Sequence, residues 1–449
     1  MLCITASGSL GAATLTVHAT PPRYLLQPVV GSVHPCSSGQ APWHVHFLLA
    51  DGRVAGESYC GQVAYGSEPF VWYPDGAVVE YLRGDFDFTQ PLALLPDGRM
   101  IIAGDWCPPV TGTCTSATAI ASPNAAPIVL SAASTAILAY DRSDSGWAVG
   151  FGAADGSNAW RSTPAGVVEF LGITEGWGES VEAVNESGQA VGNSYVNNQY
   201  RGLRWEADGS YTLLAPAELG TTTAGLDVAI DGTVVGGSNG RAAWWPNSAL
   251  TTAAVPLLPI GTNSWATHIA GNPSSAGPLG WEIFGTLQSG TRLFHATSGQ
   301  ATQEIPLPAG SFIGVEVIDA PRADFMLAQA HTDIYTPVPM VWSPDDGLLR
   351  FESLVVNPAT LPPFSGYRAI DANAAGSILL TIGFDGQPYV AKVLAPGDVN
   401  GDDSVNGVDL GAVLSRWGQS SGGIRAAEDF DGDSLIGASD LAIVLANWG

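Results

Sequence analysis

The sequence predicts an all-β fold, a β-propeller of seven or eight blades, followed by a small helical domain. Two observations support this prediction. A turn followed by an apolar strand that ends in glycine recurs at intervals of roughly 42 to 55 residues between positions 43 and 394, the period of propeller repeats. In the C-terminal tail, a loop pattern rich in side-chain oxygens occurs twice. Each copy is followed by apolar residues at helical spacing.

The repeat itself predicts four short antiparallel strands in each unit. The clear copies of the turn begin at Asp51, Asp97, Asp144, Glu186 and Asp231, and weaker copies cover residues 281–285, 324–328 and 376–383. A short apolar stretch precedes each turn, and an aromatic-bearing strand such as residues 70–72 or 203–205 follows the glycine. Paired apolar runs around Asp-Gly turns are hairpins. We expect the strand at 24–30 to close the ring by completing the last unit.

The blade consensus, best shown by residues 181–214, resembles the extracellular HAF repeat. That family is defined by its repeat and its secreted setting rather than by a reaction. The resemblance therefore implies an architecture and an extracellular location. One tryptophan recurs at a fixed position of the units, and we expect it to pack between blades rather than to bind sugar rings.

The tail contains two candidate calcium loops of twelve residues. Positions 1, 3, 5 and 12 carry side-chain oxygens in both copies, the spacing with which such a loop surrounds a hard cation. Position 7 offers a backbone carbonyl, and at position 9 the second copy has Gly437, where a water would have to substitute. The predicted ligands of two Ca²⁺ ions are Asp398, Asn400, Asp402, Ser404, Asn406 and Asp409 in the first loop and Asp429, Asp431, Asp433, Leu435 and Asp440 in the second.

Each loop is followed by the same pattern, Asp-Leu-x-x-Val-Leu-x-x-Trp-Gly. Its apolar residues recur at i, i+3, i+4 and i+7, so each copy predicts a helix with one apolar stripe that its twin would bury. The stripes are Leu410, Val413, Leu414 and Trp417 in the first copy and Leu441, Val444, Leu445 and Trp448 in the second. Gly418 and Gly449 stand where C-terminal caps are expected.

This duplicated loop and helix, over about residues 397–449, resembles the dockerin-type module. The resemblance implies calcium binding and attachment to a cohesin-like receptor domain. The chain departs from the pattern at position 6, where Asp403 and Ser434 replace the glycine of the sharp turn. Of the partner-selecting positions 10 and 11, only Ser439 carries the expected hydroxyl, so the resemblance does not identify the receptor.

The charge balance excludes several classes of partner. The chain has 16 basic and 42 acidic residues, a formal net charge of −26, and a single lysine, Lys392. Such a chain has no general affinity for nucleic acid or for an anionic membrane. No segment is long and apolar enough to span a bilayer. We expect a candidate signal peptide at 1–19, though without a basic start, the propeller at 20–394, a flexible linker at 395–397 and the docking domain at 398–449.

The five cysteines favour an oxidising compartment. If Cys3 leaves with a signal peptide, four remain, and Cys107 with Cys114 and Cys36 with Cys60 are the expected pairs. The alternative is buried free thiols in a reducing compartment.

Catalytic motifs are scarce. His44 and His46 alternate on a predicted strand and could share a metal, but two ligands are too few for a site. His268, His295 and His331 are expected in different blades, where they could meet at one mouth of the ring. The segment 343–347 resembles part of an Asp box, and we expect it to be an ordinary turn. There is no catalytic serine motif, phosphate loop or dinucleotide fingerprint in the sequence.

These observations predict a secreted, non-catalytic binding or scaffold protein. Its propeller would present a face to an unidentified ligand, a glycan or a protein, and its calcium-dependent module would attach it to a receptor or an extracellular assembly. The alternative is an extracellular hydrolase or lyase that acts on a polysaccharide and is tethered by the same module. A cluster of ionisable groups with shifted pKa values at one mouth of the propeller would favour the enzyme. A third possibility is a structural surface-layer component.

Overall fold

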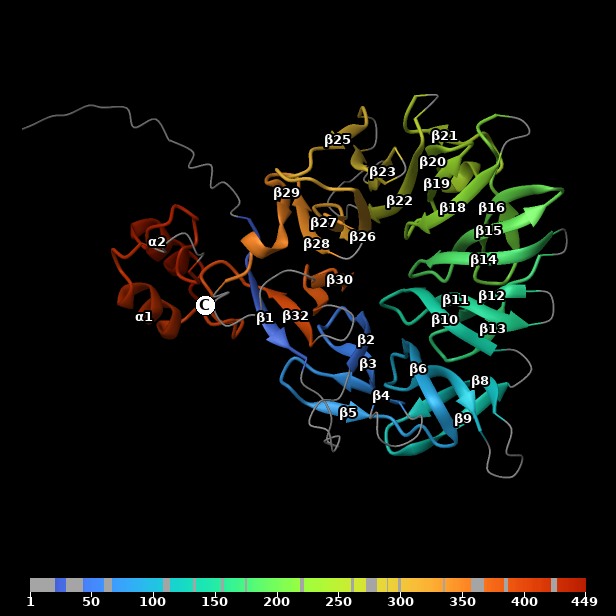
Figure 1. The fold of residues 1–449 in the computed structure, drawn as a ribbon, viewed down its shortest axis with the longest axis horizontal. Coiled ribbons are helices and arrows are strands. Elements are labelled where there is room, and N and C mark those ends of the chain that lie inside the picture. Colours follow the sequence, from blue (N-terminus) through green and yellow to red (C-terminus); the bar gives the residue numbers. More distant parts are fainter. Residues whose placement is uncertain are drawn as a thin grey trace, which may run out of the picture.

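Eight four-stranded antiparallel sheets surround a central axis in the part of the chain that the computed structural model describes (Figure 1). The sequence left seven or eight blades open, and the structure has eight. The described residues are 21–29, 43–59, 67–107, 114–131, 135–154, 157–173, 176–218, 222–259, 262–271, 281–288, 290–297, 300–333, 336–356, 367–382, 387–420 and 426–449.

Blades 1 to 4 each use four consecutive strands, ordered from the central axis outward. Blade 1 contains β2 (Trp43–Leu48), β3 (Val54–Tyr59), β4 (Ser67–Trp72) and β5 (Val78–Glu80). Blade 2 contains β6 (Phe86–Leu94), β7 (Met100–Trp106), β8 (Thr115–Ser122) and β9 (Ala125–Ser131). Blade 3 contains β10 (Thr135–Arg142), β11 (Ala148–Ala154), β12 (Ser157–Ser162) and β13 (Val168–Phe170). Blade 4 contains β14 (Gly176–Val184), β15 (Ala190–Val196), β16 (Gln199–Trp205) and β17 (Tyr211–Leu213).

Blades 5 to 7 repeat this order, and blade 8 takes its outer strand from the other end of the chain. Blade 5 contains β18 (Thr223–Val228), β19 (Val234–Ser238), β20 (Arg241–Trp245) and β21 (Val255–Pro256). Blade 6 contains β22 (Ser264–Gly271), β23 (Trp281–Leu287), β24 (Arg292–Thr297) and β25 (Gln303–Ile305). Blade 7 contains β26 (Gly314–Arg322), β27 (Phe325–His331), β28 (Pro337–Ser343) and β29 (Gly347–Arg350). Blade 8 contains β30 (Tyr367–Ala372), β31 (Ile378–Ile382), β32 (Pro388–Val393) and β1 (Tyr24–Pro28). Two short 3₁₀ helices, η1 (Asn247–Ala249) and η2 (Phe351–Ser353), follow β20 and β29.

The ring closes as the sequence predicts. β1 pairs antiparallel with β32, from Tyr24 opposite Val393 to Pro28 opposite Tyr389. The Asp-Gly and Ser-Gly turns also lie where the repeat places them, between the first and second strands. The turn glycine has a positive φ in six blades, at Gly52, Gly98, Gly146, Gly188, Gly232 and Gly376. The segment 343–347 is the ordinary turn between β28 and β29, in which Ser343 Oγ accepts from Asp346 N at 3.1 Å.

Tryptophans fill the spaces between neighbouring blades, as predicted. Trp160, Trp205 and Trp245 are completely buried, and Trp72 and Trp342 nearly so. Trp160, for example, packs in one cluster with residues of blade 2, among them Leu92 and Ile101. Because every blade buries such a cluster against the next, the ring has no single core but a core at each junction.

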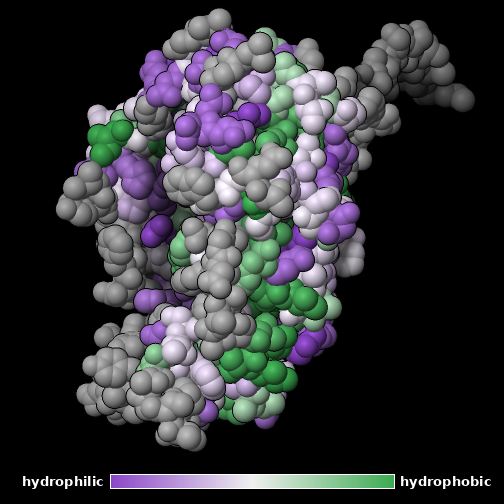
Figure 2. All heavy atoms as spheres, turned by 90° about the vertical axis from the view of Figure 1, so that its right-hand side faces the viewer, coloured by the Kyte–Doolittle hydropathy of each residue, from purple (hydrophilic) through white to green (hydrophobic). Residues whose placement is uncertain are grey.

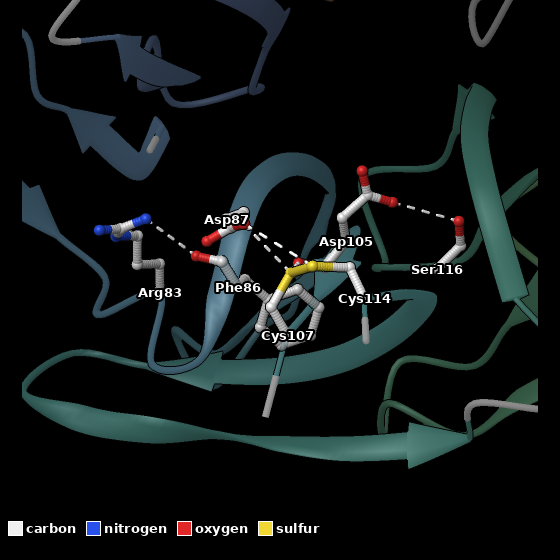
Figure 3. The surroundings of a disulfide bond; sticks show 7 residues. All are labelled: Arg83, Phe86, Asp87, Asp105, Cys107, Cys114 and Ser116. Atoms are coloured by element: carbon white, nitrogen blue, oxygen red, sulfur yellow. Dashed lines mark hydrogen bonds between the residues drawn. A yellow bond between two sulfur atoms is a disulfide. The ribbon is translucent and has the colours of Figure 1, made fainter. Parts of the chain in front are cut away.

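The predicted Cys107–Cys114 disulfide is present and joins the residue after β7 to the residue before β8 (Figure 3). Asp87 of β6 lies above it, with Oδ2 at 3.2 Å from Cys107 Sγ. Cys36 and Cys60, the other predicted pair, lie outside the described residues.

The side of the propeller formed by blades 2 to 4 exposes apolar and polar residues together (Figure 2). Apolar residues gather toward the end where blade 2 lies. There β9 is an edge strand, and Ile128 and Leu130 on it are exposed.

Beyond the propeller, α1 (Gly407–Ser415) and α2 (Ala438–Ala446) lie beside β1 and β32 (Figure 1). The two helices pack around a small core that includes Val413, Val444 and Ile436. Residues 395–397 form a turn, in which Asp398 N donates to Ala395 O at 3.0 Å. No described helix reaches the length that a membrane span requires.

Candidate functional site

The first predicted calcium loop is tied to itself by its first and last carboxylates. Asp398 is completely buried and accepts from Gly401 N at 2.7 Å and from Asp403 N at 3.1 Å. Asp409, also buried, reaches back to accept from Val399 N at 2.8 Å. These bonds bring position 12 beside position 1, so that the loop surrounds a small space with oxygens.

The second loop has the same arrangement. Asp429 accepts from Ser434 N at 3.1 Å. Asp440 accepts from Phe430 N at 2.6 Å and from Gly437 N at 2.7 Å. The two loops begin more than thirty positions apart in the chain. Each has the same pattern of hydrogen bonds, because each has the same pattern of side chains.

Between these ends, oxygens of the odd-numbered positions accept from the amide two residues on. Such Asx turns keep the side chains on the inner side of the loop. The pairs are Asn400 Oδ1 with Asp402 N, Asp402 Oδ1 with Ser404 N, Asp431 Oδ1 with Asp433 N and Asp433 Oδ1 with Leu435 N. Asn406, the predicted ligand at position 9, also caps α1, since its Oδ1 accepts from Val408 N at 2.8 Å.

Position 6 carries the expected backbone conformation without its usual glycine. Asp403 has a φ of 66° and Ser434 a φ of 69°. At position 4, Gly401 and Gly432 also have positive φ values, 76° and 72°. The loops therefore make the sharp turn that calcium loops require, at the expense of strain in two residues with side chains.

The donor set fits a hard cation. Asp429, Asp431 and Asp433 bring one oxygen each within 4.8 Å of one another. Asp429 is only 2% exposed, and its Oδ1 has no hydrogen-bond partner among the described residues. Burial raises the pKa of Asp440, and the negative charge of Asp431 adds to that rise. A bound cation would satisfy the buried oxygen and remove this repulsion.

The helical stripes are only half buried, contrary to the prediction. Val413 and Val444 are completely buried, but Leu414, Trp417, Leu445 and Trp448 are 47% to 56% exposed. The reason is that the two helices share a core with the loops, which occupies one side of each stripe only. Gly418 and Gly449 also differ from simple caps, since each donates to the opposite loop, at Ile436 O and Val405 O.

A second site lies in the propeller itself. A cavity of about 510 Å³ opens at the end of the ring where the first hairpin turns lie, lined by the last residues of seven innermost strands. In all eight blades the innermost strand has a β-bulge at the same place. The residue after the bulge is an aspartate in four blades, at Asp141, Asp227, Asp319 and Asp371, and a histidine in a fifth, at His268.

Each of these aspartates bonds to the next blade. Asp371 of blade 8 accepts from Leu48 N of blade 1 at 2.8 Å. Asp141 of blade 3 accepts in the same way from Val184 N of blade 4 at 2.7 Å. The equivalent bonds of Asp227 and Asp319 reach Ile269 N and Ala372 N. The aspartates thus hold neighbouring blades together while they line the cavity.

The four carboxyl groups line one cavity and are buried by the protein around them. Burial raises the pKa of Asp141 to about 6 and, together with the charge of Asp141, that of Asp227 to about 7. Burial and the charge of Asp371 raise the pKa of Asp319 well above its ordinary value. Burial also raises the pKa of Asp371, and the positive charge of Arg142 opposes that rise.

Arg142 supplies positive charge to this cavity. Its guanidinium lies 3.9 Å from the centre of the Phe47 ring, and its Nε donates to Leu92 O at 2.9 Å. Burial lowers the pKa of His268, which also lines the cavity, to about 4, so that this histidine is neutral near pH 7.

The predicted histidine groups are arranged differently from expectation. His268 and His295 lie in the same blade, blade 6, and not in different ones. His295 pairs with Glu282 and His331 with Glu316, and among these three histidines only His268 lines the cavity. The three residues therefore do not form one site, because their strands place them at different radii of the ring.

His44 and His46 have a third neighbour that the sequence did not reveal. Glu57 of β3 is 4% exposed, and its Oε1 lies 3.5 Å from His44 Nδ1 and 3.6 Å from His46 Nε2. His46 lines the central cavity. The carboxylate stands between the two rings, and the three side chains do not form one of the close groups of candidate metal ligands found among the described residues.

The sequence carries a signal for the cavity aspartates. Asp141, Asp227 and Asp371 each stand five positions before the turn glycine of their repeat. An acidic residue recurring at one repeat position will recur at one height of a ring, and its copies then converge on the axis.

Neither a protein-family model nor a curated protein sequence matches this chain. Solved structures share its general shape at low similarity. A streptogramin B lyase has a TM-score of 0.39 and 10% identity over 83% of this chain and 98% of that chain. An oligogalacturonate lyase in complex with manganese has 0.39 and 12% over the same shares. Oligopeptidase B from Leishmania major has 0.44 and 10% over 76% of this chain and 52% of its own. All three TM-scores lie below 0.5.

Proposed function

We propose that this chain is a secreted calcium-binding protein whose C-terminal dockerin-like module attaches an HAF-type propeller to a cohesin-like receptor. The observation that carries the proposal is the pair of loops with one hydrogen-bond network and one backbone turn at position 6. The Cys107–Cys114 disulfide and the net charge of −26 agree with a place outside the cell, where calcium is plentiful.

The proposed docking surface is the exposed half of the helical stripes. It consists of two equivalent pairs, Leu414 with Trp417 and Leu445 with Trp448, one at the C-terminal end of each helix. Exposed tryptophans commonly anchor protein interfaces, and the neighbouring leucines extend the apolar patch around them. Because calcium would order the loops that begin each helix, attachment would depend on calcium.

Calorimetric titration of the full chain with calcium tests the metal part of this proposal. We expect two ions to bind. Asp402→Ala and Asp433→Ala, at position 5 of either loop, should each remove about one ion. Asp75→Ala, in an exposed turn of blade 1, is the matched control and should leave both ions in place. Binding of no ion to the unchanged chain would contradict the proposal.

Surface binding to a panel of recombinant cohesin domains tests the docking part. Binding to one of them in calcium, lost in excess chelator, is the expected result. Trp417→Ala or Trp448→Ala should weaken it at least about tenfold without changing calcium binding. If the chain bound two calcium ions but no cohesin domain, the docking part of the proposal would be contradicted and the calcium-binding part would remain.

A second candidate function is supported by the central cavity. It groups four aspartates, all with raised pKa values, which is the feature that would favour an enzyme. A general acid needs such a protonated carboxyl group near pH 7, and cleavage of an extracellular polysaccharide uses two carboxyl groups. The test is an assay for cleavage of acidic and neutral polysaccharides. Activity that is lost in Asp319→Asn but kept in Asp402→Ala, which changes only a calcium loop, would support this candidate.

A further inference from the structure

The ring of the propeller is closed by one strand that comes from the far end of the chain. β1 completes blade 8 by pairing with β32. On its other side, Tyr24 N donates to Leu354 O and Tyr24 O accepts from Val356 N. An outer strand with few bonds is the first part of a sheet to open. The stability of the closed ring therefore depends on what covers β1.

The residue just before β1 is held by the C-terminal module. Arg23 is 6% exposed, and its Nη2 donates to the carbonyl oxygens of Ala426 and Ala427, which lead into the second calcium loop. Its guanidinium lies 4.5 Å from the centre of the Phe430 ring. Phe430 is position 2 of that loop, and its amide is bonded to Asp440 at position 12.

The next residues of the closure are held by the first loop. Leu25 of β1 and Lys392 of β32 stand opposite each other in the strand register. Lys392 Nζ, the chain's single lysine, donates to Gly401 O at 2.9 Å and to Asp403 Oδ2 at 2.6 Å. Leu25 packs so closely against Gly401 that a Cβ there would lie 2.7 Å from its Cδ2.

Both strands of the closure thus contact parts of the module whose shape depends on the calcium loops. Gly401 and Asp403 are positions 4 and 6 of the first loop, where the backbone turns sharply. Val356 and Leu394 of the propeller also pack against Ala427 of the C-terminal module. Without a cation, the carboxylates gathered in each loop would repel one another, which would loosen the conformation that these contacts require.

We propose that the C-terminal module is a calcium-dependent clasp that locks the propeller ring at its β1–β32 closure. The ligand is a divalent cation with a preference for oxygen, and this inference rests on the calcium binding proposed above. Arg23, Leu25 and Lys392 act as positioning residues, which transmit the order of the loops to β1. The exposed Trp417 and Trp448 lie outside this contact, so clasp and docking surface can act together.

Hydrogen exchange of the full chain, with calcium and with excess chelator, tests the clasp. We expect calcium to slow exchange at residues 21–29 and 387–394 by about tenfold or more. The hairpin at 199–213 in blade 4 is the internal reference and should not change. Lys392→Met should lose most of the calcium effect at the closure while calorimetry still finds two ions.

Arg292→Met is the matched control, because it removes one cation from an exposed ion pair with Glu304 within blade 6. It should keep the full calcium effect at the closure. Arg23→Gln provides a second test of the contact and should behave like Lys392→Met.

The outcomes separate this inference from the proposed function. Calcium binding without any change of exchange at 21–29 would overturn the clasp and leave the calcium module intact. The clasp would also be contradicted if Lys392→Met and Arg23→Gln both showed the same slowing of exchange by calcium as the unchanged chain. Absence of calcium binding would overturn both proposals.

Discussion

Single residues of the repeat are explained by the bulge in the innermost strand. Gly150 and Gly192 stand opposite the residue before the bulge, and a Cβ there would lie 1.8 Å and 2.0 Å from the carbonyl oxygens of Leu138 and Ser180. The glycine of the motif is thus required by a close approach of two backbones. Ile102, Ala328 and Leu380 take this place in blades 2, 7 and 8, so the requirement belongs to the local backbone of each blade.

Gly192→Ala should therefore destabilise the propeller by about 2 kcal/mol, because either strand must move to admit the methyl group. Chemical denaturation measures the change. Gly172→Ala is the control, since no atom lies within 4 Å of the Cβ that would be added there. A loss below about 0.5 kcal/mol for Gly192→Ala would mean that the strands are not packed as described.

The cavity aspartates predict a pH dependence of stability. With pKa values of about 7 and 6 in the folded protein, Asp227 and Asp141 keep protons that the unfolded chain, with a value near 3.8, releases at lower pH. The free energy of unfolding should therefore fall as the pH rises from about 4 to 7. His268, with its lowered pKa, makes the free energy of unfolding rise between about pH 4 and 6.5. This is one group, whereas at least two aspartates act in the other direction.

Asp227→Asn should flatten this profile, although it also removes one acceptor of the Ile269 and Val228 amides. We expect the drop in unfolding free energy between about pH 5 and 8 to shrink by about 1 to 3 kcal/mol. Denaturation series at several pH values measure it, and Asp75→Ala should keep the slope of the unchanged protein. A profile of unchanged slope in Asp227→Asn would show that Asp227 is ionised throughout.

At the level of elements, each calcium loop is a compromise between its ligands and its turn. The positive φ of Asp403 and Ser434 is a conformation that glycine adopts freely and that other residues adopt with strain. At position 403 the side chain has a compensating role, because it reaches Lys392. Within the part of the chain that the structure describes, the Ser434 side chain makes no comparable contact, and only its backbone amide is bonded, to Asp429.

Ser434→Gly should therefore strengthen the second loop by about 1 kcal/mol, seen as tighter calcium binding in calorimetry. Ser439→Gly, within α2, is a control with the opposite sign, since glycine inside a helix lowers stability by a similar amount. Weaker calcium binding in Ser434→Gly would contradict the assigned turn.

At the level of the whole molecule, the excess of acidic residues opposes the compact ring. Acidic residues outnumber basic ones by 42 to 16, and the central cavity gathers several of them at one place. Such self-repulsion lowers the stability of the folded state at low ionic strength. Calcium and dissolved salt relieve it in different ways, by binding at the loops and by screening everywhere.

Raising sodium chloride from about 20 to 200 mM in excess chelator should thus raise the melting temperature by several degrees. Choline chloride at equal ionic strength should do the same, because screening does not depend on the cation. A rise with sodium alone would point to specific ion binding, and a fall with both salts would contradict the argument. In saturating calcium the rise should be smaller.

The sequence by itself determined the all-β propeller, its hairpin turns, the closing strand, one disulfide and the two loops, because each is written in residues close together in the chain or in a pattern that repeats. Only the tertiary structure decided the number of blades, the meeting of Asp141, Asp227, Asp319 and Asp371 in one cavity, the exposure of half of each helical stripe, and the seating of the module on β1. Arg23 and Ala427 are 404 positions apart. Such contacts depend on how the closed ring places its two ends, and no local pattern records that distance.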